Sequence, residues 1–375
     1  MKLNPVFVGC IFVGCNASKG DIDRSRCGKE MTLCTIAGTG SPGYNGQDNL
    51  ATELKLTYPS ALILDPSGRL MVSDAGNFLI RRFDGDQLNS VVGSHRKGLA
   101  IEELALLETP IDFVMDMKFA DDGRMAMLEA DGRQLSLVDF DADELDVIAY
   151  SEEGWNSEDV TPIEEVQFSS PSSFAYDDAG NMYVADAGLE VNMILKIDPV
   201  EGVVTKVAGV DDFGFPLSST STEEFALQNH LKNPQGLLWR DGKLWVADTG
   251  RHRIITIDVE TGEATNVSGI SDAYGYGDDV PLAEARLNSP SRFTFDSSGR
   301  ITIADTGNGV IRAELNDGTI DTICGRGAGD YDPNPQDPEG ASLDQPFDLL
   351  YEPNGDLVFT DIGHGVVRRI SQPDW

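Results

Sequence analysis

Six acidic residues recur at one position of a repeated phrase, and carboxylates are groups that can do chemistry. The phrase reads LMVSDAGNFLI at 70–80, LWVADTGRHRI at 244–254, ITIADTGNGVI at 301–311 and LVFTDIGHGVV at 357–367. Carboxylates can serve as general acids and bases or as metal ligands, but a single active site does not need six regularly spaced copies. We therefore expect a structural role, in which each carboxylate accepts hydrogen bonds from N–H groups of the tight turn that follows it. The acids are Asp74, Glu129, Asp186, Asp248, Asp305 and Asp361.

Other motifs that suggest catalysis or ligand binding lack the context that their chemistry needs. GTGSPG at 38–43 fits a dinucleotide-binding pattern, but no strand–helix–strand unit surrounds it. The acidic segment YDPNPQDPEG at 331–340 lacks the ligand spacing and central glycine of an EF-hand, so we expect a solvated loop. The four histidines form no H-E-x-x-H pair, and no G-x-S-x-G elbow occurs. We therefore predict no catalytic residue, metal site or cofactor.

The elements that carry the six acids can be read from the glycines and prolines around them. Each acid lies six residues after a glycine that ends a polar turn, and these glycines are 55–62 residues apart. The glycines are Gly68, Gly123, Gly180, Gly242, Gly299 and Gly355. A proline opens each unit, and a bulky apolar residue lies three positions before it. The prolines are Pro59, Pro110, Pro171, Pro234, Pro290 and Pro346.

Each unit reads as four short strands. In the fourth unit GLLW, LWVAD, RIITID and ATNVSG are rich in apolar, aromatic and β-branched residues, and RDGK and ETGE supply turns between them. Radial repetition of four-stranded units describes a β-propeller. The sequence therefore predicts an all-β, six-bladed propeller of four-stranded blades.

The outer strands also predict how the ring closes. Motifs of the type ATNVSG end the first five units, at 88–93, 145–150, 204–209, 264–269 and 320–325. The sixth unit ends near Ile370 without such a motif, but LCTIAG at 33–38 supplies one near the N-terminus. We therefore expect the N-terminal strand to pair with the third strand of the last unit, around 365–370.

The fourth unit, NPQGLLWRDGKLWVADTGRHRIITID, closely resembles the NHL repeat. The loop GTGSPGYNGQDNLATELKLTYP also resembles the long loops of bacterial and teneurin-type NHL propellers. The resemblance covers about residues 33–371. It is strong in units 1, 4, 5 and 6, weaker in unit 3, and poorest in unit 2, where Glu129 replaces the aspartate.

The resemblance to NHL propellers implies binding of a protein, peptide or glycan on a loop-rich face, without catalysis. The alternative is an enzyme with its site at the channel mouth, because propeller lactonases and NHL-like lyases share this architecture. The lactonase type needs a Glu, Asn and Asp set around a metal ion, and the lyase type needs a set of histidines. Neither set can be placed on this sequence, so binding is the preferred interpretation.

Three charged residues near the predicted channel are candidates for a ligand site. NHL repeats usually carry glycine two residues after the opening proline, as at Gly236, whereas this sequence has Asp112, Arg292 and Asp348 in three of its units. These charges could bind a neutral or cationic ligand. Alternatively, an Arg292–Asp348 salt bridge between neighbouring blades could simply fill the channel.

Long loops join each outer strand to the next proline, and we expect them to cluster on the face where the inner strands begin. Loops of this length on a rigid ring often carry function. They also contain aromatic residues of the kind that anchor interfaces. Tyr44, Tyr274 and Tyr276 are the main candidates, and the full set is Tyr44, Trp155, Phe213, Phe215, Tyr274, Tyr276 and Tyr331.

The N-terminus resembles a bacterial lipoprotein signal. An apolar run over residues 3–14 leads into FVGC at 12–15, which is similar to a lipobox. The resemblance implies a signal peptide at 1–14, lipid on Cys15, a polar tether over 15–30 and the propeller over 31–375. Cys27 and Cys34 are then close enough in sequence to form a disulfide, and Cys324 is left as a free thiol in a packed position.

The net charge limits the partners. The chain has 63 Asp and Glu against 28 Lys and Arg, a formal charge of −35. Such a surface repels phosphate, so we expect no nucleic acid and no membrane contact except through the lipid. We expect a monomer on the bacterial envelope, at the outer membrane or cell surface, or a secreted protein if Cys15 is not lipidated.

Overall fold

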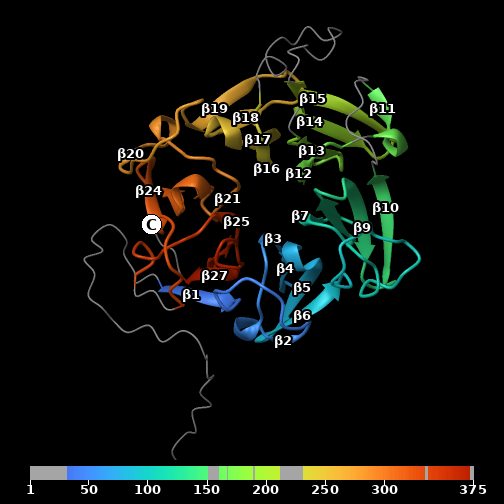
Figure 1. Ribbon diagram of the computed structural model, residues 1–375. Coiled ribbons are helices and arrows are strands. Elements are labelled where there is room, and N and C mark those ends of the chain that lie inside the picture. The colour runs from blue at the N-terminus through green and yellow to red at the C-terminus, as the bar shows by residue number, and fades with distance from the viewer. Residues whose placement is uncertain are drawn as a thin grey trace, which may run out of the picture.

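The computed structural model describes residues 32–150, 160–166, 168–188, 191–211, 231–333 and 337–371. Six antiparallel sheets radiate from one axis, with the first strand of each blade at the centre and the last at the rim (Figure 1). The prediction of an all-β, six-bladed propeller is therefore confirmed.

The strands follow one another within each blade from the centre outward. Blade 1 contains β3 (Pro59–Leu64), β4 (Leu70–Asp74), β5 (Leu79–Asp84) and β6 (Gln87–Val92). Blade 2 contains β7 (Val114–Phe119), β8 (Met125–Glu129), β9 (Gln134–Asp139) and β10 (Glu144–Tyr150). Blade 3 contains β12 (Pro171–Tyr176), β13 (Met182–Asp186), β14 (Val191–Asp198) and β15 (Val203–Asp211).

The second half of the ring has the same order. Blade 4 contains β16 (Pro234–Arg240), β17 (Lys243–Asp248), β18 (Arg253–Ile257) and β19 (Ala264–Gly269). Blade 5 contains β21 (Phe293–Phe295), β22 (Ile301–Asp305), β23 (Val310–Glu314) and β24 (Thr319–Cys324). Blade 6 contains β25 (Pro346–Tyr351), β26 (Leu357–Asp361), β27 (Val366–Ser371) and, at its rim, β1 (Thr32–Ala37).

Ring closure occurs as the sequence predicts. Strand β1 pairs antiparallel with β27, from Thr32 opposite Ser371 to Ala37 opposite Val367. The first described strand and the last one thus lie in the same blade, and the N-terminal strand covers an edge of β27 that would otherwise be free to pair elsewhere.

Three blades gain a short fifth strand that the sequence did not predict. The inter-blade loops pair briefly with the rims of blades 1, 3 and 5 through β2 (Asn49–Leu50), β11 (Val160–Pro162) and β20 (Val280–Pro281). Each is followed by a 3-10 helix, η1 (Ala51–Glu53), η3 (Ile163–Glu165) or η5 (Leu282–Glu284). Three more 3-10 helices, η2 (Ala75–Asn77), η4 (Thr249–Arg251) and η6 (Thr306–Asn308), connect second to third strands. These loops are therefore ordered against the blades that they approach.

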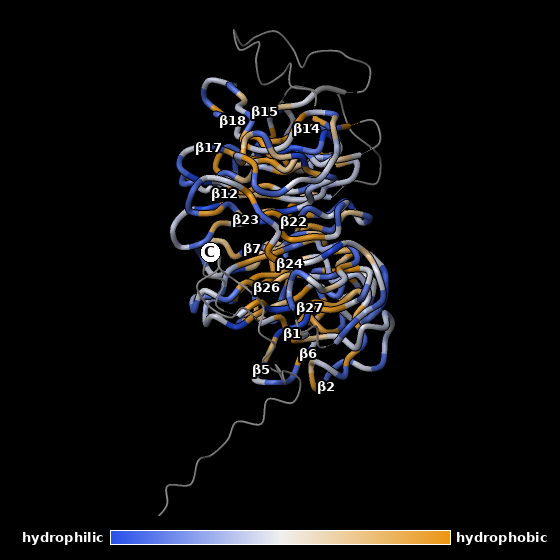
Figure 2. The backbone as a smooth tube through the Cα atoms, turned by 90° about the vertical axis from the view of Figure 1, so that its left-hand side faces the viewer, coloured by the Kyte–Doolittle hydropathy of each residue, from blue (hydrophilic) through white to orange (hydrophobic). Residues whose placement is uncertain are grey.

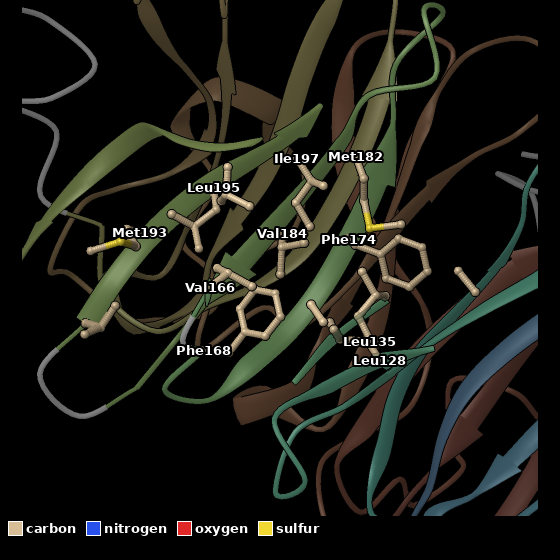
Figure 3. Packing of buried hydrophobic residues seen from close by; sticks show 14 residues of the cluster. Leu128, Leu135, Val166, Phe168, Phe174, Met182, Val184, Met193, Leu195 and Ile197 are labelled. Atoms are coloured by element: carbon tan, nitrogen blue, oxygen red, sulfur yellow. The ribbon is translucent and has the colours of Figure 1, made fainter. Parts of the chain in front are cut away.

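The hydrophobic core is divided into six layers, one between each pair of neighbouring blades. The layer between blades 2 and 3 combines Leu128 and Leu135 with Phe174, Val184 and Leu195 (Figure 3). Equivalent layers of buried residues occupy the other five interfaces. Apolar segments accordingly lie within the sheets, and hydrophilic turns lie at their ends (Figure 2).

Blade 2 begins four residues later than its proline indicates. Val114 lies opposite Glu129, as Pro59 lies opposite Asp74 in blade 1. Ile111, three residues before Val114, is buried, whereas Leu107, three residues before Pro110, is 49% exposed. Burial of the apolar face sets the register of this strand, and Pro110 lies in the loop that precedes it.

Candidate functional site

The six recurring acids fasten the inter-blade loops to the blades. All six side chains are fully buried. Each carboxylate accepts a hydrogen bond of 2.6–2.8 Å from a backbone N–H of the incoming loop, two residues before the inner strand in five blades and five residues before it in blade 5. The donors are Thr57, Asp112, Ser169, Lys232, Asn288 and Asp344. The sequence predicts these donors in the turn after each acid, but they belong to the incoming loop.

In blades 5, 6 and 1, which are neighbours in the ring, the third strand of each blade supplies a fully buried arginine that lies next to the acid. Arg81 Nε donates to Asp74 Oδ2 at 2.8 Å, and Arg368 Nε donates to Asp361 Oδ2 at 2.9 Å. Arg312 Nη1 lies 3.6 Å from Asp305 Oδ2. Other guanidinium N–H groups donate to loop carbonyls, including those of Gln47, Gly277 and Ser342, and Arg312 Nε donates to the loop carboxylate of Asp278. Each arginine therefore links a blade to the loop that crosses it.

The acids of blades 2 and 3 have no such arginine bonded to them. Burial, together with the nearby Asp112 carboxylate, raises the pKa of Glu129 to about 8 against the lowering effect of the hydrogen bond from the Asp112 N–H. Burial also raises the pKa of Asp186 to about 6, although this carboxylate accepts N–H bonds from Ser169 and Ser170. Glu129 Oε1 is buried without a hydrogen-bond partner. Protonation of Glu129 is the response that physical chemistry expects for such a group.

The three charged channel candidates do not form one cluster. Because blade 2 begins at Val114, the residue equivalent to Arg292 and Asp348 is Asp116 and not Asp112. Asp112 lies in the loop two residues before β7, its Oδ1 is 3.4 Å from Lys97 Nζ, and its carboxylate also accepts the Phe113 N–H. Counting from Pro110 along the sequence pointed to Asp112 and therefore missed Asp116.

Arg292 spans the channel from blade 5 to the opposite blades. Its Nη2 donates to the carbonyls of Met115 in blade 2, at 3.0 Å, and Ser172 in blade 3, at 2.8 Å. Asp116 Oδ2 lies 3.9 Å from the same nitrogen. Burial alone would raise the pKa of Asp116, but Lys118 and Arg292 together hold it below its ordinary value. Arg292 therefore crosses the channel, and its ion-pair contact is with Asp116 of blade 2 on the other side of the ring.

Asp116 and Asp348 also hold neighbouring blades together. Asp348 Oδ2 accepts the N–H of Leu62 in blade 1 at 2.7 Å. Asp116 Oδ2 accepts the N–H of Phe174 in blade 3 at 3.0 Å. Burial raises the pKa of Asp348 to about 6, with Arg292 opposing the rise and Asp116 adding to it. Both carboxylates therefore have structural partners.

A small apolar cluster lies next to these charges at the end of the channel where the inner strands begin. It contains buried Met115, Phe347 and Ile362 with partly buried Tyr58 and Phe113 around them. The rings of Tyr58 and Phe113 meet edge to face with centroids 4.7 Å apart. We call this end of the ring, formed by the inter-blade loops and the second-to-third-strand turns, the loop face.

The aromatic candidates on the described loops lie on the loop face but apart from the channel charges. Tyr274 is 69% exposed and Tyr276 is 54% exposed. Tyr44 stacks on His95 with ring centroids 3.6 Å apart, and Tyr274 meets His252 edge-on at 5.6 Å. Tyr276 also has partners of its own, because its hydroxyl donates to Asp278 and its ring faces Arg312.

Several predicted features lie outside the described residues. These are the lipidated Cys15, Cys27, Trp155, Phe213 and Phe215. Cys34 is disulfide-bonded, and Cys324 is a buried free thiol. The pairing of Cys34 with Cys27 stays a prediction.

The described residues contain no group of three His, Cys, Asp or Glu side chains able to hold a metal ion. Within the same ranges, no helix is long and apolar enough to span a membrane.

The chain resembles several proteins in sequence, and no protein-family model matches it. It is 26% identical over 305 residues to Protein SUPPRESSOR OF QUENCHING 1 of Arabidopsis thaliana, and 25% identical over 261 residues to Teneurin-1 of Caenorhabditis elegans. These matches cover 76% and 63% of this chain, but the chain spans only 27% and 9% of the two longer proteins. The teneurin match agrees with the loop type expected from the sequence.

Solved structures share the propeller fold at low sequence identity. Two auxiliary nutrient binding proteins, from Bacteroides thetaiotaomicron and Bacteroides ovatus, superpose with TM-scores of 0.65 and 0.64 at 14% and 16% identity. Each match covers 91% of this chain and 76% of the other. A streptogramin B lyase superposes with a TM-score of 0.54 at 12% identity over 91% of this chain and 97% of the lyase. Binding proteins and an enzyme thus share this fold, so the fold alone does not define the function.

Proposed function

We propose that this propeller is a non-catalytic binding module that takes a protein, peptide or glycan ligand on its loop face. One observation carries the proposal. Of the nine large apolar or aromatic side chains exposed in the described part of the chain, eight belong to the inter-blade loops and Val200 belongs to the β14–β15 turn on the opposite face. Four of the eight, Tyr44, Ile270, Tyr274 and Tyr276, flank second-to-third-strand turns on the loop face, whereas Leu50 and Leu107 lie where their loops run along the rim to the β5–β6 and β9–β10 turns. The eight are Tyr44, Leu50, Leu99, Ile101, Leu107, Ile270, Tyr274 and Tyr276.

The loops that bear these side chains are well anchored, which favours recognition. Buried Arg81 holds the loop of Tyr44 through the carbonyls of Gly46 and Gln47. Buried Arg312 holds the loop of Tyr276 through the Gly277 carbonyl and Asp278. Exposed aromatic groups on pre-organised loops lose little conformational entropy when a ligand binds.

The chemistry of the face favours a neutral or cationic ligand. Tyrosine rings can stack on sugar rings or on peptide groups and can donate hydrogen bonds through their hydroxyls. The formal charge of −35 attracts basic partners and repels anionic ones. The nutrient binding proteins of similar fold support a binding role, and the ligand class of this chain is our proposal.

The proposal can be tested by comparing the two faces. The purified protein would be screened against glycan and peptide arrays, with the double variant Tyr44→Ala/Tyr274→Ala and the opposite-face variant Val200→Ser as its matched control. We expect a ligand that the tyrosine variant binds about tenfold or more weakly, and that Val200→Ser binds normally. Loss of binding only in opposite-face variants would contradict the proposed site, and turnover of an array hit would favour an enzyme.

We also propose that Cys15 carries lipid and tethers the ring to a bacterial envelope. The lipobox-like FVGC at 12–15 supports this. Detergent phase partition of the full chain and of Cys15→Ala tests it. The wild type should enter the detergent phase and the variant should not, and equal partition of both would refute lipidation.

A further inference from the structure

Three turns of the loop face share a device that joins the recurring acid to the incoming loop. In blades 1 and 5 the third residue after the acid is an asparagine, Asn77 or Asn308. Asn77 Nδ2 donates to Asp74 at 3.0 Å and to the Gly43 carbonyl at 2.9 Å. Asn308 Nδ2 donates to Asp305 at 2.8 Å and to the Gly275 carbonyl at 2.7 Å. One amide nitrogen with two hydrogens thus bridges a blade and a loop at any ordinary pH.

In blade 6 the same position holds His364. Its Nδ1 lies 2.8 Å from Asp361 Oδ2, and its Nε2 lies 2.9 Å from the carbonyl oxygen of Gly329. Both partners are hydrogen-bond acceptors, since Asp361 Oδ2 also accepts from Arg368 Nε. A neutral imidazole carries one N–H and can satisfy only one of them, whereas the imidazolium satisfies both. Arg368 Nη2 also lies 3.5 Å from Nδ1, but this contact is longer than the two contacts with acceptor oxygens, so the geometry favours the protonated ring.

The groups around His364 favour this charge on balance. The hydrogen bond to Asp361 raises the pKa of His364, while partial burial and the positive charge of Arg368 oppose the rise. Tyr331 packs on the ring with centroids 5.5 Å apart, and its own loop continues into Asp332, whose carbonyl accepts from Arg368. Asp344 is bonded through its N–H to Asp361 Oδ1, on the far side of that carboxylate.

We infer that His364 is a pH-sensitive latch: its protonated imidazole bonds both Asp361 of blade 6 and the 326–333 loop, whereas its neutral form bonds only one of them. Asn77 and Asn308 form the equivalent bridges in blades 1 and 5 and do not titrate. When the proton leaves, the Nδ1 or the Nε2 lone pair faces an acceptor oxygen, and one of the two bonds is lost. The latch is thus closed at low pH and opens as the pH rises through the pKa of the folded protein.

The consequence for recognition rests on the proposed function. The 326–333 loop carries Tyr331 on the loop face, with its hydroxyl bonded to Thr35 in the rim strand of blade 6. Opening of the latch would loosen this part of the face without disturbing the loops held by asparagine. Binding of a ligand that touches the blade 6 sector would therefore weaken with rising pH, and binding elsewhere would not.

Two measurements on the full chain test the latch without a ligand. Imidazole ¹H–¹⁵N correlation spectra should show His364 with both nitrogens protonated at about pH 6 and titrating above His252, whose pKa burial lowers, and His364→Asn identifies the signal. Hydrogen exchange, corrected for intrinsic rates, should show protection of 326–333 falling about tenfold between about pH 6 and about pH 9. Segments 43–48 and 275–279 should keep their protection, and His364→Asn should remove the change at 326–333.

The reverse substitution keeps the inference testable if His364→Asn folds poorly. Asn77→His should make the protection of 43–48 depend on pH in the same direction. A neutral His364 at about pH 6, or equal pH profiles for all three segments in the wild type, would overturn the latch. Neither result depends on a ligand, so the latch can fail while the proposed binding face stands, and the converse also holds.

Discussion

At the scale of single residues, the six acids occupy one position of the fold but differ in environment. Asp74 lies between an arginine, an asparagine and a backbone N–H, whereas Glu129 has one N–H partner and an unpaired oxygen. The longer side chain of Glu129 accepts the equivalent N–H of the incoming loop, that of Asp112, and no arginine in the described part of the chain is bonded to it. The structural role could be predicted from repetition, but the donors could not, because they come from loops that are distant in the sequence.

Replacing Glu129 by glutamine should remove a pH dependence of folding. The folded pKa of about 8 exceeds the ordinary value of 4.5, so folding takes up a proton between these limits and the stability falls as the pH rises through them. In Glu129→Gln the free energy of unfolding should fall less steeply between pH 5 and pH 8, by about 1 kcal/mol per pH unit. Denaturant unfolding over this range measures the slope.

The exposed Glu144 in the same blade gives the control for this prediction. Glu144→Gln should keep the slope of the wild type. Burial also raises the pKa of Asp186, Asp305 and Asp348 to about 6. In every variant, these three groups should therefore still lower the free energy of unfolding as the pH rises towards 6. Identical slopes for Glu129→Gln and the wild type would show that Glu129 is ionised in the folded chain.

At the scale of elements, local patterns predicted the blades well because each strand and turn is encoded by nearby residues. The start of blade 2 is the exception. Pro110 lies in the same order as the other opening prolines, but Ile111 and Val114 offer a second apolar pattern four residues later. The buried face of the sheet decides between them, and that choice depends on contacts with blades 1 and 3. Taking Pro110 as the start of blade 2 therefore named Asp112, and not Asp116, as the channel residue of that blade.

The closing strand should be needed for the stability of the whole ring. Strand β1 covers β27 and contributes Leu33 to the layer between blades 5 and 6 and Ala37 to the layer between blades 6 and 1. Deleting residues 32–37 should lower the melting temperature sharply, and Leu33→Ala alone should cost about 2–5 kcal/mol of unfolding free energy. Calorimetry or circular dichroism measures both.

Val200→Ala is a matched apolar truncation for the closing strand, because Val200 is 91% exposed. It should leave the melting curve unchanged. If the deletion variant melts as the wild type does, the ring does not depend on β1 for its closure.

At the scale of the whole molecule, the six apolar layers hold each blade to its two neighbours only. Arg292 adds contacts of another kind, because it reaches from blade 5 to blades 2 and 3 across the axis. The sequence singled out Arg292 but could not say where its side chain would go, since its partners across the ring lie two and three blades earlier in the chain. A salt bridge to Asp348 was one alternative, and the ion-pair contact in the structure is with Asp116.

Removing this arginine should weaken the ring more than removing a surface one. In Arg292→Met the carbonyls of Met115 and Ser172 lose their buried donor, and Asp116 and Asp348 lose a neighbouring positive charge. Breaking a buried charge network typically costs about 3 kcal/mol or more, whereas exposed pairs contribute about 1 kcal/mol or less. Arg124→Met, at its pairs with the exposed carboxylates of Asp122 and Asp146, is the control. Because both channel acids should then protonate more readily, the loss in Arg292→Met should shrink as the pH is lowered towards 5. Equal unfolding free energies for the two variants at pH 7.5 would mean that the cross-channel contacts contribute nothing to the ring.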